Sequence, residues 1–341
     1  MSYLDLSIKE LHEALVKKEV TPLELVEEAL KRAHSNQDNA FEFIDDEGAK
    51  AFASSLKEPE ADNLLWGIPY VAKDNFSTEG IPTTASSNIL NGYVPVFDAT
   101  VIRKLKDSKA VMIAKATLDE LAMGGTGTTG HLGKTFNPYD PSHKHEIGGS
   151  SCGSAVSVAA DIVPFALGSD TGDSVRKPAS YAGLVGMKPT WGRISRYGLF
   201  PFAPSLDHVG YFTRDVYSSA ALLSVLAGRD LHDSTSSTKP VENYLEDLDK
   251  PVKGMRIAVI QEIYDSLTNE ELKKHFDRSL EKLKEQGIAV DFVKFGVKLL
   301  ESLYATYMVI SCAEATSNDA NLDGIKFGEF KGGKTYQEGV V

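Results

Sequence analysis

Apolar residues near the start of the chain recur at helical spacing. Two stripes keep this spacing: Ile8, Leu11 and Leu15, then Leu23, Val26 and Leu30. The second stripe follows a helix start signal, in which Thr21 can cap, Pro22 suits the first helical position and Glu24 completes a capping box. We therefore expect residues 1–35 to form a pair of helices packed on the body of the protein.

Further along, short apolar runs typical of buried strands alternate with helical stretches. The expected strands are residues 64–76, 110–114 and 162–167, and then 255–260 and 288–293, which flank a helix over 268–286 as a β-α-β unit. A short helix is expected over residues 117–123, whereas residues 124–154 show little periodicity. This alternation predicts an α/β fold in which helices cover a largely parallel or mixed sheet.

Composition narrows the class of protein. The 341 residues allow one large or two ordinary domains. No long linker is evident, and residues 234–251 are the best candidate for an exposed loop. A formal net charge of −12 disfavours direct binding to nucleic acid or to an anionic membrane surface, so a partner would have to hold any nucleic acid. Cys152 and Cys312 are too few for a disulfide framework or a cysteine zinc site. The first residues contain no apolar leader, and we expect a cytoplasmic protein.

Three motifs resemble cofactor or metal sites, but each lacks the neighbouring residues or elements that such a site requires. Residues 125–130, GTGTTG, here called the glycine loop, match a dinucleotide pattern but follow a helical segment, not a strand. The GKT of residues 133–135 lacks the glycine that a phosphate-binding loop needs at Thr128. His143 and His145 lack a supporting carboxylate–histidine spacing. We therefore expect neither a bound cofactor nor a metal in this chain.

Three separate segments carry residues suited to nucleophilic catalysis. Ser174 lies in a hydroxyl-rich turn just after an expected core strand, where the alternative is a loop that caps the next helix. None of the three segments contains a histidine, which leaves Lys73 as the base. Lys73 ends an apolar strand, and burial there would lower its pKa and keep it neutral. Ser150 could bridge the lysine and the nucleophile and carry the proton in both directions.

The turn before Ser174 also offers backbone donors. The N–H groups of Thr171, Gly172 and Asp173 follow one another in it. Successive N–H groups of this kind can stabilise the oxyanion of a tetrahedral intermediate. The sequence thus predicts an oxyanion hole beside the candidate nucleophile.

Residues 148–214, which begin GGSSCGSAVSVAADIVPFALGSDTGDS, closely resemble the amidase signature family. The 24 residues between Ser150 and Ser174, with the lysine of GIPYVAKDN upstream, fit that family's Ser–Ser–Lys triad. The resemblance implies that Ser174 is the nucleophile, that Ser150 is a bridging serine reached through a cis peptide, and that Lys73 is the base. It also implies a single domain over residues 1–341, with a central mixed, twisted sheet covered by helices on both faces.

Within the family, the chain resembles the A subunits of glutamyl-tRNA(Gln) or aspartyl-tRNA(Asn) amidotransferases. The blocks SRYGLFPFAPSLDHVG, GRDLHDSTSS, TLDELAMGG and AEATSNDANLDGIKFG carry this likeness. It implies that glutamine is hydrolysed and that ammonia passes to a tRNA-binding partner subunit, which uses ATP and Mg²⁺. It also implies a small linking subunit, with tRNA reached only through the partner.

The chain departs from the family pattern at three points. Asp173 stands where the family usually has glycine, and we expect its side chain to turn away from the oxyanion or to pair with Arg176 or Lys177. Cys152 replaces a glycine after the bridging serine. Family members usually extend beyond residue 341, so a C-terminal truncation is expected. Two alternatives stay open: a stand-alone amidase for small amides, and a catalytically weak scaffold subunit.

Overall fold

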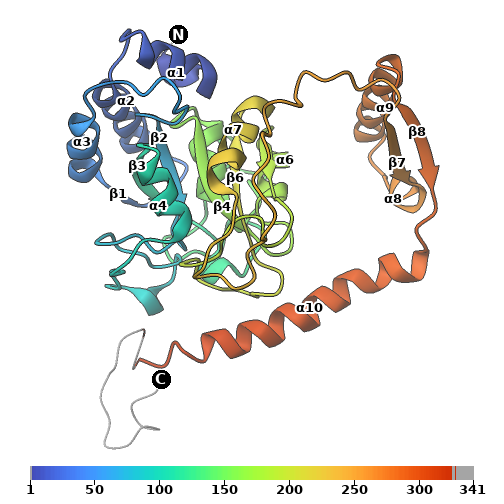
Figure 1. The fold of residues 1–341 in the computed structure, drawn as a ribbon. Helices are drawn as coiled ribbons and strands as arrows, with labels where there is room; N and C mark the ends of the chain where they lie inside the picture. Colours follow the sequence, from blue (N-terminus) through green and yellow to red (C-terminus); the bar gives the residue numbers. More distant parts are fainter. Residues whose placement is uncertain (1, 325–326, 328–341) are drawn as a thin grey trace, which may run out of the picture. The chain divides into compact units, whose positions relative to one another are not determined.

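The computed structural model describes residues 2–324 and residue 327, and these form two compact units (Figure 1). Unit 1 comprises the chain up to Leu245 together with the residues from Ala313 onward, and unit 2 comprises Glu246–Cys312. The single domain predicted over residues 1–341 stays a prediction. Among the described helices, none combines the length and the apolar character needed to cross a membrane.

Unit 1 is built around a six-stranded mixed sheet with the order β1-β3-β2-β4-β6-β5. β2 lies between β3 and β4 and runs parallel to both, whereas β1, β6 and β5 pair antiparallel with their neighbours. The α/β fold with a mixed sheet is therefore confirmed. The strands are β1 (Phe41–Ile44), β2 (Pro69–Lys73), β3 (Val111–Ala116), β4 (Phe165–Asp170), β5 (Val185–Met187) and β6 (His208–Thr213).

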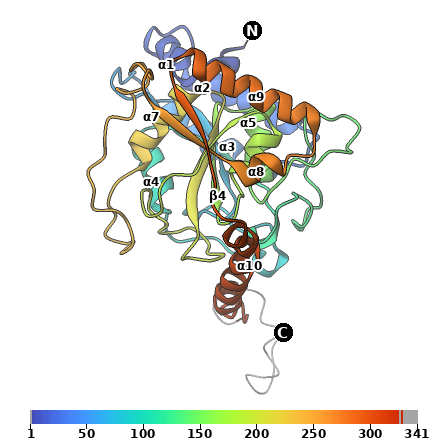
Figure 2. The same ribbon diagram turned by 90° about the vertical axis from the view of Figure 1, so that its right-hand side faces the viewer.

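Helices cover both faces of this sheet, as expected. α4 and α7 lie over one face and α5 over the opposite face, as two perpendicular views show (Figures 1 and 2). α5 contacts β2, β3, β4 and β6, so it packs across the centre of the sheet. The helices of unit 1 before its C-terminal part are α1 (Ile8–Val16), α2 (Pro22–Ser35), α3 (Asp46–Ser55), α4 (Thr100–Asp107), α5 (Cys152–Ala159), α6 (Arg176–Tyr181) and α7 (Val216–Leu226), with short 3₁₀ helices η1 (Tyr3–Asp5), η2 (Asn88–Leu90) and η3 (Glu120–Ala122).

The N-terminal helix pair forms where the apolar spacing predicts it. The Thr21 hydroxyl accepts the N–H of Glu24 at 3.2 Å, and the Glu24 carboxylate accepts the N–H of Thr21 at 2.8 Å. This reciprocal capping box satisfies two backbone donors at the start of α2. Val26 and Leu30 are buried, whereas Leu23 is only half-buried.

The strand predicted over residues 162–167 is wrong by three residues, because β4 is Phe165–Asp170. The first residues of the apolar run instead close the end of α5. The N–H groups of Ile162 and Val163 donate to the carbonyl of Ser157 at 3.0 and 3.1 Å. Pro164 then follows and has no N–H to donate to a neighbouring strand. The shift moves the strand end to Asp170, directly before the serine-bearing turn.

The helix predicted over residues 117–123 is also wrong, since only the 3₁₀ turn η3 forms there. Leu121 and Ala122 have positive φ angles of 53° and 63°, which are incompatible with a continuing α-helix. The sequence did not reveal α5, because all eight of its residues are buried and no amphipathic stripe marks it. The four-residue strand β1 was missed as well.

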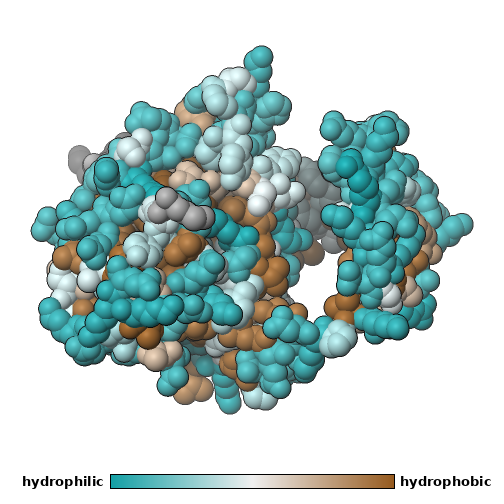
Figure 3. Space-filling view, turned by 90° about the horizontal axis from the view of Figure 1, so that it is seen from above, coloured by the Kyte–Doolittle hydropathy of each residue, from teal (hydrophilic) through white to brown (hydrophobic). Residues whose placement is uncertain are grey.

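Unit 2 contains the predicted β-α-β unit. β7 (Arg256–Ile260) and β8 (Ala289–Val293) pair in parallel, with Arg256 opposite Ala289, and α9 (Glu270–Glu285) connects them after the short α8 (Gln261–Asp265). α10 (Val297–Asp319) follows and runs into the C-terminal part of unit 1. Apolar side chains also reach the surface and are brown in Figure 3. The exposed apolar residues of unit 2 include Met255, Phe295, Leu303 and Val309.

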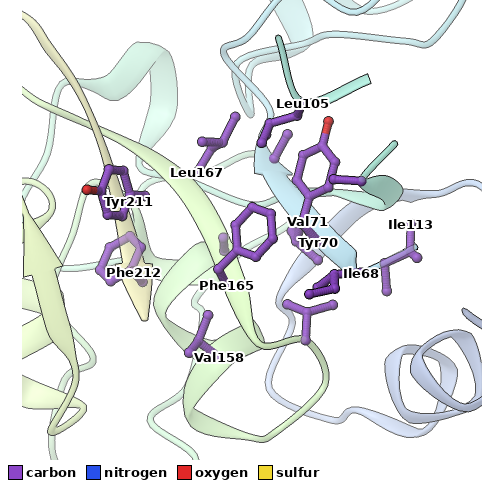
Figure 4. Packing of buried hydrophobic residues seen from close by; sticks show 14 of the residues in the cluster. Ile68, Tyr70, Val71, Leu105, Ile113, Val158, Phe165, Leu167, Tyr211 and Phe212 are labelled. Carbon is purple, nitrogen blue, oxygen red and sulfur yellow. The ribbon is translucent and has the colours of Figure 1, made fainter. Parts of the chain in front are cut away.

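In the core of unit 1, aromatic side chains of the two central strands, β2 and β4, pack against each other. The rings of Tyr70 on β2 and Phe165 on β4 stack with centroids 5.2 Å apart and an interplanar angle of 4° (Figure 4). Both side chains are buried, as are Tyr211 and Phe212 on β6. Because β2 and β4 carry segments of the candidate site, this packing fixes the distance between them.

Phe165→Ala tests the importance of this packing. Removing the ring from a filled core should lower the free energy of unfolding by about 3–5 kcal/mol. Urea unfolding followed by the fluorescence of Trp66 and Trp191, the two tryptophans of the chain and both in unit 1, measures the change. Leu231→Ala is the control, because Leu231 is 84% exposed and its loss should change stability by less than about 0.5 kcal/mol. Equal stabilities of the two variants would contradict the assignment.

Candidate active site

Lys73 is the last residue of β2 and is fully buried between its two neighbouring strands. Its Nζ atom donates to the Oγ atom of Ser150 at 2.8 Å. The expected contact between these two side chains, which are 77 residues apart in the chain, is therefore present. In its neutral form the same amine has a lone pair that can accept the Ser150 hydroxyl proton.

Ser150 follows a cis peptide bond from Gly149, as the family resemblance implies. The Ser150 carbonyl accepts the N–H of Asp119 at 3.1 Å, so backbone as well as side chain is held. Cys152 then begins α5, where its thiol is buried and lies 3.6 Å from the carbonyl of Thr117. The cysteine that replaces the usual glycine is thus accommodated inside the protein.

Two further side chains at the lysine were missed by the sequence reasoning. The Ser169 hydroxyl accepts from Lys73 Nζ at 2.9 Å and from the side-chain amide of Asn75 at 2.9 Å. Both residues lie inside segments that the sequence singles out, VAKDN and GSDTGDS. Only the parallel pairing of β2 with β4, which joins segments about 95 residues apart, brings them together.

Ser174 lies in the turn that joins β4 to α6 and is only 5% exposed. Its carbonyl accepts the N–H of Ser151 at 3.2 Å. This bond holds the backbone next to Ser150 against the backbone of Ser174. The structure therefore brings the segments of Lys73, Ser150 and Ser174 to one place, at the carboxyl ends of β2 and β4.

Buried Asp170 holds the C-terminal end of the turn, at Val175 and Arg176. It accepts the N–H groups of Val175 and Arg176 at 3.0 and 3.2 Å, and the Arg176 guanidinium at 2.8 and 3.1 Å. Burial raises the pKa of Asp170, but the bonds from Arg176 and Val175 outweigh it and hold that pKa below its ordinary value. Asp170 is therefore a charged anchor for the start of α6.

Asp207 holds the N-terminal end of the turn, at Thr171. The Thr171 hydroxyl donates to its carboxylate at 2.6 Å, and the N–H groups of Phe202 and Ala203 donate at 3.0 and 3.1 Å. Thr171, Gly172 and Asp173, the predicted oxyanion donors, thus lie between two buried carboxylates that hold the chain on either side. This arrangement limits the freedom of the turn, and the Arg176 guanidinium also donates to the carbonyl of Gly172.

Asp173 pairs with Lys177 on α6, with an Nζ–Oδ2 distance of 2.9 Å. Its side chain is 46% exposed. One of the two ion pairs considered for Asp173 is therefore present, and the carbonyl of Asp173 accepts the N–H of Lys177 at 2.8 Å.

Burial lowers the pKa of Lys73 from 10.5 to about 8. Negative charge on Cys152, Asp119, Asp170 or Asp207 acts in the opposite direction and raises that pKa. Burial raises the pKa of the Cys152 thiol to about 11, so this thiol is not ionised near neutral pH. A substantial fraction of Lys73 is thus neutral in slightly alkaline solution, as a general base requires.

Comparison with known proteins shows which family the chain resembles. The model of the family described as Amidase matches residues 24–339. The A subunit of glutamyl-tRNA(Gln) amidotransferase from Pediococcus pentosaceus is 44% identical over 337 residues, which cover 96% of this chain and 68% of the relative. The corresponding protein of Oenococcus oeni is 42% identical over 331 residues, which cover 94% of this chain and 66% of the relative.

Solved structures show the same likeness. The A subunit of glutamyl-tRNA(Gln) amidotransferase from Thermotoga maritima superposes with a TM-score of 0.83 at 39% identity, over 94% of this chain and 68% of that one. The peptide amidase of Stenotrophomonas maltophilia gives a TM-score of 0.83 at 29% identity, with the same coverage. The chain therefore spans about two thirds of the length of these proteins.

Titration of the Lys73 amine tests the electrostatics of the site. In the folded protein its pKa should be about 8, whereas after unfolding it should return to the ordinary 10.5. The ¹⁵Nζ resonance followed against pH measures this value, and Lys73→Met identifies the signal by its loss. A Lys73 signal that titrates together with the exposed lysines would contradict a buried, readily neutralised base.

Proposed function

The chain belongs to the amidase family, and we propose that it is the glutaminase subunit of a tRNA-dependent amidotransferase. The observation that carries the proposal is the buried contact of 2.8 Å between Lys73 and Ser150. The backbone bond from the N–H of Ser151 to the carbonyl of Ser174 supports Ser174 as the nucleophile of this proposal, because it joins the two serine segments. The proposal is further supported by 44% identity to an amidotransferase A subunit over 96% of the chain.

In the proposed reaction, the Ser174 hydroxyl attacks the side-chain amide carbon of glutamine. Ser150 takes the proton of Ser174 as it passes its own proton to neutral Lys73. The negative oxygen of the tetrahedral intermediate is stabilised by the backbone N–H groups of Thr171, Gly172 and Asp173.

The reaction then continues in two stages, the loss of ammonia from this intermediate and the hydrolysis of the acyl-enzyme. The carbon–nitrogen bond breaks while the proton returns through Ser150 to the leaving nitrogen, so ammonia departs and an ester on Ser174 remains. Water attacks this ester by the same proton route and releases glutamate. Ser169 keeps the amine of Lys73 oriented throughout, because it accepts a second hydrogen bond from Nζ at 2.9 Å.

The ammonia has a use only in a larger complex. We propose that it passes to a partner subunit that binds tRNA and uses ATP and Mg²⁺ to activate the carboxylate of Glu-tRNA(Gln) or Asp-tRNA(Asn). A small linking subunit would complete this cytoplasmic complex. The net charge of −12 supports a division in which the partner holds the tRNA phosphates.

A second candidate is a stand-alone amidase for small amides. The observation in its favour is the TM-score of 0.83 with a peptide amidase. Adding the tRNA-binding partner with ATP separates the two functions. A rise in glutamine hydrolysis supports the amidotransferase role, whereas partner-independent hydrolysis of simple amides with no effect of the partner supports the stand-alone enzyme.

Ser174→Ala should abolish ammonia release from glutamine and the covalent acyl-enzyme, which intact-protein mass spectrometry detects. The thermal unfolding midpoint should stay unchanged, because the hydroxyl contributes little to packing in the turn. Ser180→Ala is the matched control, since Ser180 is an exposed residue of α6, and its activity should equal that of the wild type. Undiminished glutamine hydrolysis by Ser174→Ala would exclude Ser174 as the nucleophile.

Asp173→Gly should change the rate of glutamine hydrolysis by less than about tenfold, because its partly exposed ion pair contributes little and the backbone N–H is retained. Steady-state ammonia release measures the rate. Lys177→Gln breaks the same ion pair and serves as the comparison. A rise of about a hundredfold in Asp173→Gly would show that the native turn impairs catalysis and would favour the scaffold alternative.

A further inference from the structure

The glycine loop has a structural role that its dinucleotide-like pattern does not indicate. It wraps around the buried carboxylate of Asp119. The N–H groups of Thr126 and Gly127 donate to Oδ2 at 3.1 and 3.0 Å, and those of Thr128 and Thr129 donate to Oδ1 at 2.9 and 3.2 Å. The hydroxyl of Thr129 adds a fifth bond at 3.0 Å.

Four consecutive backbone N–H groups that converge on one point form an anion-binding concavity. In this protein the anion is a side chain of the same chain. The five hydrogen bonds hold the carboxylate of Asp119 in one position, because moving it would break all of them, including the bond from the buried N–H of Gly127.

Asp119 also holds the backbone of the bridging serine. Its N–H donates to the Ser150 carbonyl at 3.1 Å. Its carboxylate lies directly against Gly149, since a Cβ atom added to Gly149 would stand only 2.0 Å from Oδ2. The same Cβ would stand 3.0 Å from the nitrogen of Gly127, so the glycine loop presses on this peptide as well.

The charge of Asp119 reaches the candidate base. Asp119, Asp170 and Asp207 each raise the pKa of Lys73 against the larger effect of burial, as would an ionised Cys152. Of these groups, Asp119 is the one whose backbone is bonded to Ser150. The position of Asp119 therefore affects both the backbone of Ser150 and the pKa of Lys73.

We propose that Asp119, fixed by the glycine loop, is a positioning residue that holds the Gly149–Ser150 backbone so that Ser150 stays in contact with Lys73. Asp119 touches no reacting atom and acts only through Ser150 and Lys73. The inference rests on the proposed function, because it assumes that Ser150 relays a proton from Ser174.

The test is Asp119→Asn in the full chain. The side-chain amide keeps the shape of the carboxylate but loses its charge and replaces one acceptor oxygen by a donor. The readout is the rate at which a fluorophosphonate labels Ser174 as a function of pH, which needs no glutamine. We expect labelling to slow by about a hundredfold, the effect of a small displacement of a reacting group.

The pH profile adds a readout that a purely structural role would not change. Removing a negative charge that raises the pKa of Lys73 should move the midpoint of the labelling profile to lower pH. Asp230→Asn is the matched control. Asp230 is also a buried carboxylate, with bonds from Ser195, Thr100 and the N–H of His232, and its loss should leave both the rate and the midpoint unchanged.

A labelling rate and midpoint in Asp119→Asn equal to those of the wild type would overturn the proposal. If that variant does not fold, Thr129→Val decides, because it removes one donor from Asp119 and should label more slowly than the wild type; an equal rate would again overturn the proposal. Fast labelling of the wild type and slow labelling of Asp119→Asn support the inference even where the wild type hydrolyses no glutamine. Absence of glutamine hydrolysis by the wild type would contradict only the proposed function.

Discussion

The candidate active site is organised around a lysine amine that is fully buried. Burying the charged form of Lys73 is unfavourable, and the protein compensates only in part, with two serine hydroxyls at 2.8 and 2.9 Å. Full compensation by a carboxylate in direct contact would keep the lysine charged and useless as a base. The nearby aspartates instead raise its pKa from a distance, so that the value falls only to about 8.

The same aspartates have a second role, as anchors for backbone. Asp119 binds the glycine loop, Asp170 binds the first N–H groups of α6, and Asp207 binds Thr171 and two N–H groups in the segment before β6. Each carboxylate is already bonded to backbone N–H groups and to a hydroxyl or guanidinium donor, so it is not free to turn toward Lys73. The same hydrogen bonds therefore fix the loops and hold the aspartates that raise the pKa of Lys73 in their positions.

The sequence predicted the residues of this site that local patterns mark, together with the contact of Ser150 with Lys73, but it missed the side chain that strand pairing brings to the lysine. Lys73 could be assigned because an apolar run ends at it, and Ser174 because a hydroxyl-rich turn follows another run. Ser169 could not, because its role arises from the parallel pairing of β2 with β4. α5 was invisible for a related reason: a helix buried on all sides has no polar face, and periodicity detects only the contrast between faces.

The glycine loop shows how far a motif can be interpreted. Glycines and small hydroxyl residues in close succession let several N–H groups point in one direction, and this property is what the dinucleotide pattern shares with residues 125–130. The pattern indicates that an anion is bound but does not identify it. A phosphate requires a loop open to solvent, whereas Asp119, the residue just before η3, occupies the donors permanently. Because the bound anion is covalently part of the chain, the loop transmits its rigidity to Gly149 and Ser150, which a dissociable ligand could do only while it was bound.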